Sequence, residues 1–280
     1  MFSNDEVADY YDTTQNHYEK WWRLKNNLAL HYGLWLKDTK TFKQALENTN
    51  RVLLEHACIT NTDQVLDAGC GVGGSVFYIH QQTGARVTGI SLSKKQLSFA
   101  KRHLVSDKLE TRIDFQWMDF CNTTFDDASF EVIWACESVG HANDKAAFVK
   151  ECRRLLKPGG KLVMIDFWLT KEDQHDKKEL MKKWGNTWGV SQFISSDMFK
   201  SYLAQENYHH IEVIDYTQNI HKSAERLYRA ALFGAIPSII YNWLHPSVTP
   251  FAKNHYKCGF YQYQALKALL WKYKMIVATR

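Results

Sequence analysis

The chain has 280 residues, 45% of them hydrophobic, and a formal net charge of +5. This length can bury one large core and is compatible with one or two domains. The basic excess is mild and spread along the chain, without a dense cluster that would follow phosphates, so no nucleic-acid partner is expected. The six cysteines form neither a C-x-x-C pair nor a disulfide-type framework, which favours a reducing compartment and no metal site.

The N-terminal segment, residues 1–60, is interpreted as a helical cap that precedes the core. Its first residues, Met1 to Glu6, lack the basic start and apolar stretch of a secretion signal, so a cytoplasmic protein is expected. The segment carries two aromatic motifs, Tyr-Tyr-Asp-Thr-Thr at residues 10–14 and His-Tyr-Gly-Leu-Trp at residues 31–35.

A glycine-dense turn follows the strand-like run of residues 65–68 and leads into a helix that begins near Ser75. Glycines let the backbone bend sharply and approach a ligand closely, so this turn is predicted to bind an adenosine-bearing cofactor. Its spacing fits two fingerprints. One is G-x-G-x-x-G, which is typical of dinucleotides, and the other is D-x-G-x-G-x-G, which fits S-adenosylmethionine (SAM).

The second apolar strand, residues 86–90, bears on this choice. A dinucleotide site places an Asp or Glu at the end of this strand, where it binds the ribose hydroxyls. Here the chain continues Ser-Leu-Ser-Lys-Lys-Gln over residues 91–96, without an acid. The absence counts against NAD.

Further strands and helices alternate along the next stretch of chain. Residues 115–120 are predicted as a third strand with an acidic loop, residues 130–141 as a fourth strand and an active-site loop, and residues 154–166 as helix, tight turn and fifth strand. The runs 95–105 and 146–156 carry apolar residues at helical spacing. This alternation implies a parallel sheet with helices on both faces.

In this order, the motifs resemble those of class I SAM-dependent methyltransferases, in the branch that contains sterol, tocopherol, cyclopropane-fatty-acid and sugar O-methyltransferases. The resemblance spans Val65 to Asp166. It implies an α/β fold: a doubly wound, mostly parallel, seven-stranded Rossmann-like sheet with a helical cap and a reversed strand near residues 275–279. It also implies SAM as cofactor and S-adenosylhomocysteine as product.

The resemblance further implies how SAM is held. Asp67 and the glycine turn surround its methionine end, Ser91 and Gln96 replace the missing carboxylate at the ribose, and Asp119 accepts from the adenine amine. The predicted cofactor-binding residues are Asp67, Gly69, Cys70, Gly71, Gly73, Ser91, Leu92, Gln96, Trp117, Met118, Asp119 and Ala135.

Outside this SAM-binding core of residues 61–166, residues 167–280 are predicted to complete the sheet and to add helical lids at about 167–206 and 216–273. Their high density of aromatic residues favours a largely apolar acceptor pocket. The two N-terminal motifs resemble segments that close over the cofactor in tocopherol-type and sugar O-methyltransferases. The predicted acceptor-binding residues are Tyr11, His31, Trp35, Trp188 and Phe233.

The uncharged run 230–252 raises the question of a membrane span. Pro237, Pro246 and Pro250 interrupt it, so a spanning helix is not expected. The run is interpreted as a bent lid over the active site, with peripheral contact to a membrane surface left open. A packed helix pair without a ligand role is the alternative.

The predicted reaction is methyl transfer to a small, largely apolar acceptor such as an isoprenoid, a quinol-like molecule or a natural-product lipid. For a hydroxyl acceptor His141 is the candidate base, with Asp166 orienting it. For a carbon acceptor Glu137 and His141 are candidates to remove a proton from a carbocation. In the alternative reading Glu137 only grips the cofactor and His141 caps a helix.

Other functions compete with this one. N-methylation of a small amine and a SAM-binding protein without transfer activity are the alternatives kept, whereas RNA methylation is disfavoured by the absence of a basic cluster. The identity of the acceptor atom and the oligomeric state are not set by the sequence.

Overall fold

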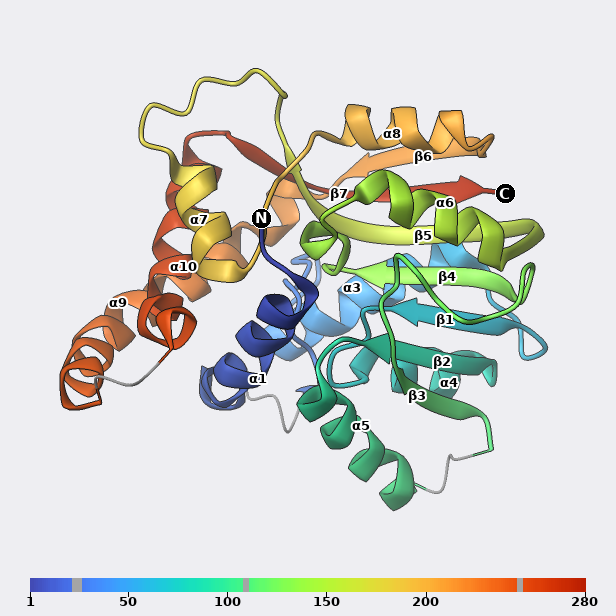
Figure 1. Cartoon of the computed structure of the whole chain (residues 1–280), viewed down its shortest axis with the longest axis horizontal. Helices are drawn as coiled ribbons and strands as arrows, with labels where there is room; N and C mark the ends of the chain where they lie inside the picture. The colour runs from blue at the N-terminus through green and yellow to red at the C-terminus, as the bar shows by residue number, and fades with distance from the viewer. Residues whose placement is uncertain (22–26, 108–110, 246–248) are drawn as a thin grey trace.

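A computed structural model of the chain describes residues 1–280 except 22–26, 108–110 and 246–248. Within these ranges, seven strands form one sheet in the order β3-β2-β1-β4-β5-β7-β6 (Figure 1). Strands β1 to β5 pair in parallel, and β7 is antiparallel to β5 and β6. The strands are β1 Gln64–Ala68, β2 Arg86–Ser91, β3 Ile113–Trp117, β4 Phe130–Cys136, β5 Leu156–Leu169, β6 His209–Asp215 and β7 Trp271–Thr279.

Helices cover both faces of the sheet (Figure 1). They are α1 Asn4–Trp21, α3 Phe42–Ala57, α4 Gly74–Thr83, α5 Lys94–Asp107, α6 Lys145–Leu155, α7 Leu180–Trp188, α8 Ser196–Gln205, α9 His221–Leu244 and α10 Pro250–Lys267, with short 3-10 turns at Val139–His141 and Thr217–Ile220. Successive residues of a strand point to opposite faces, so Val65 packs into the core under α3 and α4, and Leu66 packs into the core under α6 and α8.

The predicted fold class is confirmed. The core strands and both crossover helices between residues 65 and 166 lie within a few residues of their expected places. The reversed strand expected at residues 275–279 is the end of β7, which pairs antiparallel to β5. One boundary differs, because β5 begins before the predicted tight turn. Gly159 adopts a φ of 78°, and the β4–β5 register shifts between Phe130 and Val132 to accommodate the turn.

The loop after β4 is held in place by the cap of the next helix. Asp144 is the N-cap of α6, and its side chain accepts a hydrogen bond from the backbone N–H of Ala147. Such a cap typically contributes about 1 kcal/mol. The cap fixes where the loop ends, and it therefore helps to position His141, which lies three residues before Asp144.

Helices α7, α9 and α10 form the lid side of the molecule. In Figure 1 they lie together beyond the ends of the strands, with α9 extending away from the sheet. Helix α10 packs against both α9 and α7, and α1 packs against α10 and α5. Pro237 lies inside α9, and residues 246–248 of the predicted bent lid lie outside the described residues. None of the described helices is long and apolar enough to cross a membrane.

Candidate active site

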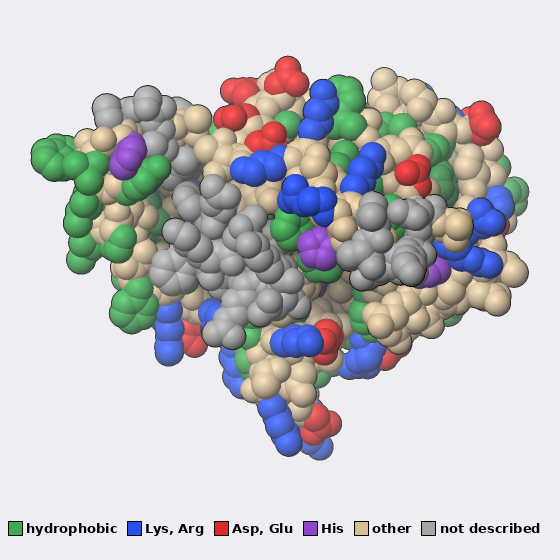
Figure 2. Space-filling view, turned by 90° about the horizontal axis from the view of Figure 1, so that it is seen from below, with side chains coloured by type: hydrophobic (Ala, Val, Ile, Leu, Met, Phe, Trp, Pro, Cys, Tyr) green, Lys and Arg blue, Asp and Glu red, His purple; other side chains and the backbone are tan. Residues whose placement is uncertain are grey.

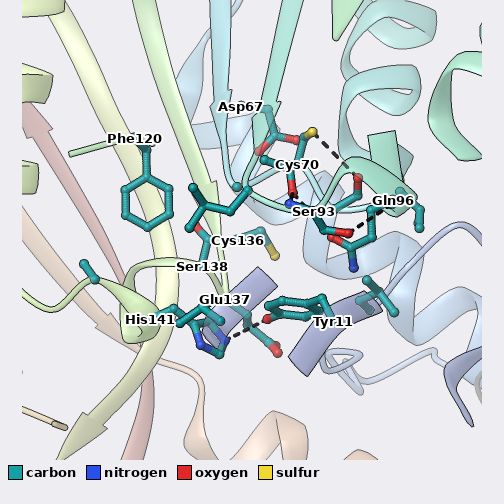
Figure 3. Close-up of a pocket in the computed structure, with 18 of the residues that line it drawn as sticks. Tyr11, Asp67, Cys70, Ser93, Gln96, Phe120, Cys136, Glu137, Ser138 and His141 are labelled. Atoms are coloured by element: carbon teal, nitrogen blue, oxygen red, sulfur yellow. Dashed lines mark hydrogen bonds between the residues drawn. The ribbon is translucent and has the colours of Figure 1, made fainter. Parts of the chain in front are cut away.

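A cavity of about 280 Å³ lies at the carboxyl ends of β1, β2 and β4, where open α/β sheets bind their ligands. Helix α1 and the segment that follows it close its other side. Figure 3 shows Asp67 and Cys70 beside one part of the cavity, with Glu137, His141 and Tyr11 at another. The predicted site residues that line it are Tyr11, His31, Asp67, Gly69, Cys70, Gly71, Ser91, Leu92, Gln96, Asp119, Glu137, His141 and Trp188.

The glycine turn is fixed by its neighbours. The backbone N–H groups of Gly69 and Cys70 both donate to the carbonyl of Ile90, and the Ser138 hydroxyl donates to the carbonyl of Ala68 at 2.6 Å. Gly69 adopts a φ of 99°, and a Cβ on it would lie 2.3 Å from the Cβ of Ser138. Only glycine fits this position, because β1 and the loop after β4 approach each other here without room for a side chain.

Asp67 is a buried carboxyl at the cavity with one oxygen left without a partner among the described residues. Its side chain is 2% exposed, and the unpartnered atom is Oδ2. Burial raises the pKa of this carboxyl from 3.8 to about 8. A buried, unsatisfied carboxyl costs free energy, and a ligand that brings an ammonium group to the cavity would relieve that cost.

The end of β2 supplies amide and hydroxyl groups. The Ser91 hydroxyl lies 3.4 Å from Oε1 of Gln96 and accepts from the backbone N–H of Ser93. The hydroxyl of Ser93 donates to the carboxylate of Asp12, which reaches this loop from α1. Thus the carboxylate that the sequence lacks after β2 is brought there by the fold, although Asp12 does not line the cavity.

Asp119 is also held by the N-terminal segment. Its Oδ2 accepts from the Asn4 side-chain amide at 2.7 Å, and its Oδ1 accepts from the backbone N–H of Cys121 at 2.8 Å. Sequence reasoning missed Asn4, since no motif distinguishes it from other surface amides. Helix α1 therefore contacts the predicted adenine end of the cavity as well as its centre.

Four predicted cofactor-binding residues do not line the cavity: Gly73, Trp117, Met118 and Ala135. The side chain of Trp117 is 58% exposed, and its indole N–H donates to the carbonyl of Leu92 on the outer side of the loop. Ala135 points from the sheet into the core under α6, and Met118 packs against the same core. Gly73 caps the start of α4 with its Cα facing Phe115.

His141 is paired with Tyr11. The Tyr11 hydroxyl lies 2.7 Å from Nε2, and Nδ1 lies 3.2 Å from the carbonyl oxygen of Gly189. A carbonyl only accepts, so Nδ1 carries the proton and Nε2 accepts from Tyr11. Burial lowers the pKa of His141 from 6.5 to about 4, which leaves the ring neutral at physiological pH.

Among the described residues, Asp166 makes no hydrogen bond to His141, contrary to the expectation. The carboxylate of Asp166 instead accepts from the backbone N–H groups of Gly140 and Phe167. Burial raises its pKa to about 6. Asp166 therefore fixes the backbone of the loop, and the carbonyl of Gly189 selects the tautomer of His141.

Glu137 lies at the centre of a buried network. Its Oε1 accepts from the backbone N–H of Tyr32 and from the Tyr273 hydroxyl, both at 2.6 Å. Burial raises the pKa of this carboxyl well above 4.5. The backbone of Glu137 also adopts a φ of 52°, in the left-handed region that residues other than glycine seldom occupy.

A second cavity of about 100 Å³ adjoins the first, and Leu30, Glu137 and Trp188 line both. Its other walls are mostly apolar and come from α7, α9 and α10: Trp184, Leu227, Ala230, Ala231, Gly234, Ser238, His255, Tyr256, Cys258 and Gly259, with Tyr32 from the N-terminal segment. The two cavities meet at a carboxyl group and an indole ring.

Two predicted acceptor-binding residues lie elsewhere. Phe233 is 77% exposed, because α9 turns its small residues inward and its large ones outward. Trp35 lies on the outer side of α9, where its indole N–H donates to the Ser223 hydroxyl and the Lys222 ammonium lies over its ring. Neither residue lines the two cavities described above.

A family of methyltransferase domains matches residues 66–164, which carry the glycine turn, β2 and the loop after β4. Over these residues the chain carries a methyltransferase domain. The methyltransferase GfsG of Streptomyces halstedii is 34% identical over 58% of this chain, and the alignment spans 57% of GfsG. The chloroplastic tocopherol O-methyltransferase of Arabidopsis thaliana is 27% identical over 81% of this chain and 69% of that protein.

A solved methyltransferase shares the whole fold. Geranyl diphosphate C-methyltransferase from Streptomyces coelicolor A3(2), in complex with Mg2+, geranyl diphosphate and S-adenosyl-L-homocysteine, is similar with a TM-score of 0.76 at 19% identity. The similarity covers 99% of this chain and 97% of that one. The cap, core and lids of this chain therefore occur together in a known fold.

The cavity residues fit SAM, the cofactor of this family. The unpartnered Oδ2 of Asp67 matches the ammonium group of a methionine moiety. The turn at Gly71 opens to the cavity, where a Cβ would approach only the Leu30 side chain and Gln96 Oε1 within 4 Å. The Ser91 and Gln96 side chains offer a hydroxyl and an amide on the same side.

Proposed function

We propose that this methyltransferase transfers the methyl group of SAM to a carbon or oxygen atom of a small, largely apolar acceptor, such as an isoprenoid, a quinol-like molecule or a natural-product lipid. The observation that carries the proposal is the apolar second cavity that shares Glu137 and Trp188 with the first. SAM in the first cavity supplies a methyl carbon on a sulfonium. An acceptor in the second cavity reaches that carbon past these two shared residues.

The substrates named for related proteins support an apolar acceptor. One relative is named a tocopherol O-methyltransferase, and the solved structure holds geranyl diphosphate. The relatives named differ in the atom that they methylate, since one is an O-methyltransferase and the other a C-methyltransferase. The choice between carbon and oxygen therefore rests on the residues of this chain.

For a hydroxyl acceptor, Tyr11 and His141 form the proton path. The acceptor hydroxyl loses its proton to the Tyr11 oxygen while the Tyr11 hydroxyl proton moves to Nε2 of His141, so one proton is transferred in all. A neutral His141 is ready for this role, and its Nδ1–H stays on the carbonyl of Gly189. Trp188, which packs edge-on to the imidazole, excludes water from the pair.

For an alkene acceptor, Glu137 is the better placed group, because it faces the second cavity directly. Methylation of an alkene leaves a positive charge on carbon, which aromatic faces stabilise until a base removes a proton. Trp184 and Trp188 stack at 5.3 Å between ring centroids along this cavity. The carboxylate of Glu137, whose Oε1 is held by Tyr273 and Tyr32, then accepts the proton on its other oxygen.

Label transfer from methyl-labelled SAM tests the proposal. An isoprenoid alcohol, a phytylated hydroquinone and a sterol are offered separately, beside lipid and RNA extracts, and the product is identified by mass spectrometry. Labelled apolar product is expected. Label found only in RNA, or in no fraction, would refute the proposed acceptor class.

A pair of variants on α9 ties the acceptor to the second cavity. Ser238 lines this cavity, whereas Ala235 lies one turn away on the same helix and lines neither cavity. Ser238→Leu should lower acceptor turnover about tenfold or more, because a misplaced acceptor loses alignment. SAM affinity should not change, and Ala235→Leu should behave as wild type. Equal turnover in both variants would place the acceptor elsewhere.

We also propose that the protein acts in the cytoplasm. The support is that all six cysteines, each among the described residues, are free thiols. Fractionation of the source cell with an antibody against the chain tests this.

A further inference from the structure

One face of α9 is apolar and exposed. Figure 2 shows hydrophobic side chains gathered at one end of the molecule, which is the end formed by α9. The exposed large residues there are Leu232 (46%), Phe233 (77%), Ile236 (70%), Ile239 (55%), Ile240 (53%), Tyr241 (53%), Trp243 (80%) and Leu244 (59%). Single exposed apolar residues are ordinary, but a contiguous set of this size marks a surface that is covered in use.

The opposite face of α9 is built differently. Ala230, Ala231, Gly234 and Ser238 are small and line the second cavity. Among the described residues, helix α9 is thus the only layer between the apolar second cavity on one side and an apolar outer surface on the other. Core packing would require large residues inward and polar residues outward, so the observed pattern has to be explained by the use of both faces.

Charge identifies what covers the outer face. Over the helix pair α9 and α10, residues 221–267, the chain has one acidic residue, Glu225, which pairs with Arg229, and six basic ones: Lys222, Arg226, Arg229, Lys253, Lys257 and Lys267. Arg226 and Arg229 are exposed on α9 and precede the apolar residues at helical spacing. The face is therefore basic toward the body of the protein and apolar toward its tip.

We propose that the exposed apolar face of α9, residues 232–244, docks on an anionic membrane surface. The apolar side chains would lie among the acyl chains and the arginines at the headgroups, and Tyr241 and Trp243 are residue types that favour the membrane–water boundary. Charge complementarity favours a lipid surface over a second copy of the chain, because two copies would bring like charges together on this face.

Docking would place the second cavity next to the bilayer. Its α9 and α10 walls belong to the same helix pair that carries the apolar face. An apolar acceptor could then pass from the membrane into the cavity without crossing water. This consequence rests on the proposed function, whereas the docking itself does not depend on SAM or on an acceptor.

Flotation with vesicles tests the docking in the absence of SAM. The full chain is mixed with vesicles of phosphatidylcholine alone, or of phosphatidylcholine with phosphatidylglycerol, at low salt. Binding is expected to the anionic vesicles and to decrease with added salt. Ile236→Glu and Trp243→Glu should each weaken it about tenfold or more, since each places a charge in the acyl region.

The matched control is Leu269→Glu. Leu269 is 71% exposed, like Ile236, but follows the far end of α10. This variant should bind vesicles as wild type does. The proposal is overturned if the wild type binds neither vesicle, if Leu269→Glu weakens binding as much as Trp243→Glu, or if sedimentation shows a dimer that Trp243→Glu dissociates. Absence of methyl transfer with intact vesicle binding would instead refute the proposed function and leave the docking supported.

Discussion

Replacing Glu137 distinguishes its structural contribution from its chemical one. The carboxyl is buried, and its Oε1 is the shared acceptor for the Tyr32 N–H and the Tyr273 hydroxyl. Because burial raises the pKa of this carboxyl well above 4.5, the group is a neutral acid in the ligand-free protein at pH 4, with its proton on the other oxygen. Glutamine copies that neutral form, since its amide oxygen accepts both bonds and its NH₂ group replaces the O–H.

The magnitudes follow from the two hydrogen bonds. Glu137→Ala leaves two buried donors without an acceptor, at about 1–3 kcal/mol each, so a loss of about 2–6 kcal/mol in the free energy of unfolding is expected. Glu137→Gln keeps both bonds and should stay within about 1 kcal/mol of wild type at pH 4.

The raised pKa of Glu137 also sets how the free energy of unfolding changes with pH. A carboxyl whose folded pKa lies above its unfolded value contributes its full stability below the unfolded pKa and loses it as pH rises toward the folded value. Wild type should therefore lose stability relative to Glu137→Gln as pH rises above 4.5, by up to about 1.4 kcal/mol per pH unit.

Urea unfolding of the two variants and wild type between pH 4 and 8, without SAM, measures both effects. Equal stability of the Ala and Gln variants would mean that the network around Glu137 does not hold the fold as described. With an alkene acceptor, Glu137→Gln should also lower turnover about a hundred- to ten-thousand-fold, and with a hydroxyl acceptor it should not.

The remaining predictions concern the first cavity. His141→Ala should lower turnover on a hydroxyl acceptor about a hundred- to ten-thousand-fold with little change in SAM affinity, as rapid-quench kinetics and calorimetry would show. Wild-type turnover should be level from pH 8 to 5 and fall toward pH 4, the lowered pKa of His141; a fall centred near 6.5 would contradict its burial. Tyr11→Phe should slow transfer to a hydroxyl acceptor and move this fall to a different pH, whereas an unchanged profile would remove Tyr11 from the proton path. Asp67→Ala should weaken SAM binding, and wild-type affinity should rise up to about tenfold per unit from pH 5 to 7, because binding favours the carboxylate whose free pKa is about 8. A pH-independent affinity in calorimetry would rule out Asp67 as the ammonium partner.

The sequence alone determined the family, the sheet and the cofactor end of the site. Local sequence patterns suffice there, because a few consecutive residues specify the glycine turn, each strand end and each crossover helix. Parallel strands then bring their carboxyl ends to one edge of the sheet. Asp67, Ser91 and Gln96 therefore meet at one cavity, as the family resemblance implied.

The tertiary structure decided the catalytic partners and the orientation of the lid. Tyr11 and His141 are 130 residues apart, and the carbonyl that orients His141 belongs to Gly189 in the turn after α7. No local sequence pattern could therefore predict that these groups, and not Asp166, are the partners of His141. The faces of α9 were equally hidden from the sequence. Its small and large apolar residues both satisfy a helical period, and only its packing against α10 shows that Ser238 lines a cavity while Phe233 is left on the surface.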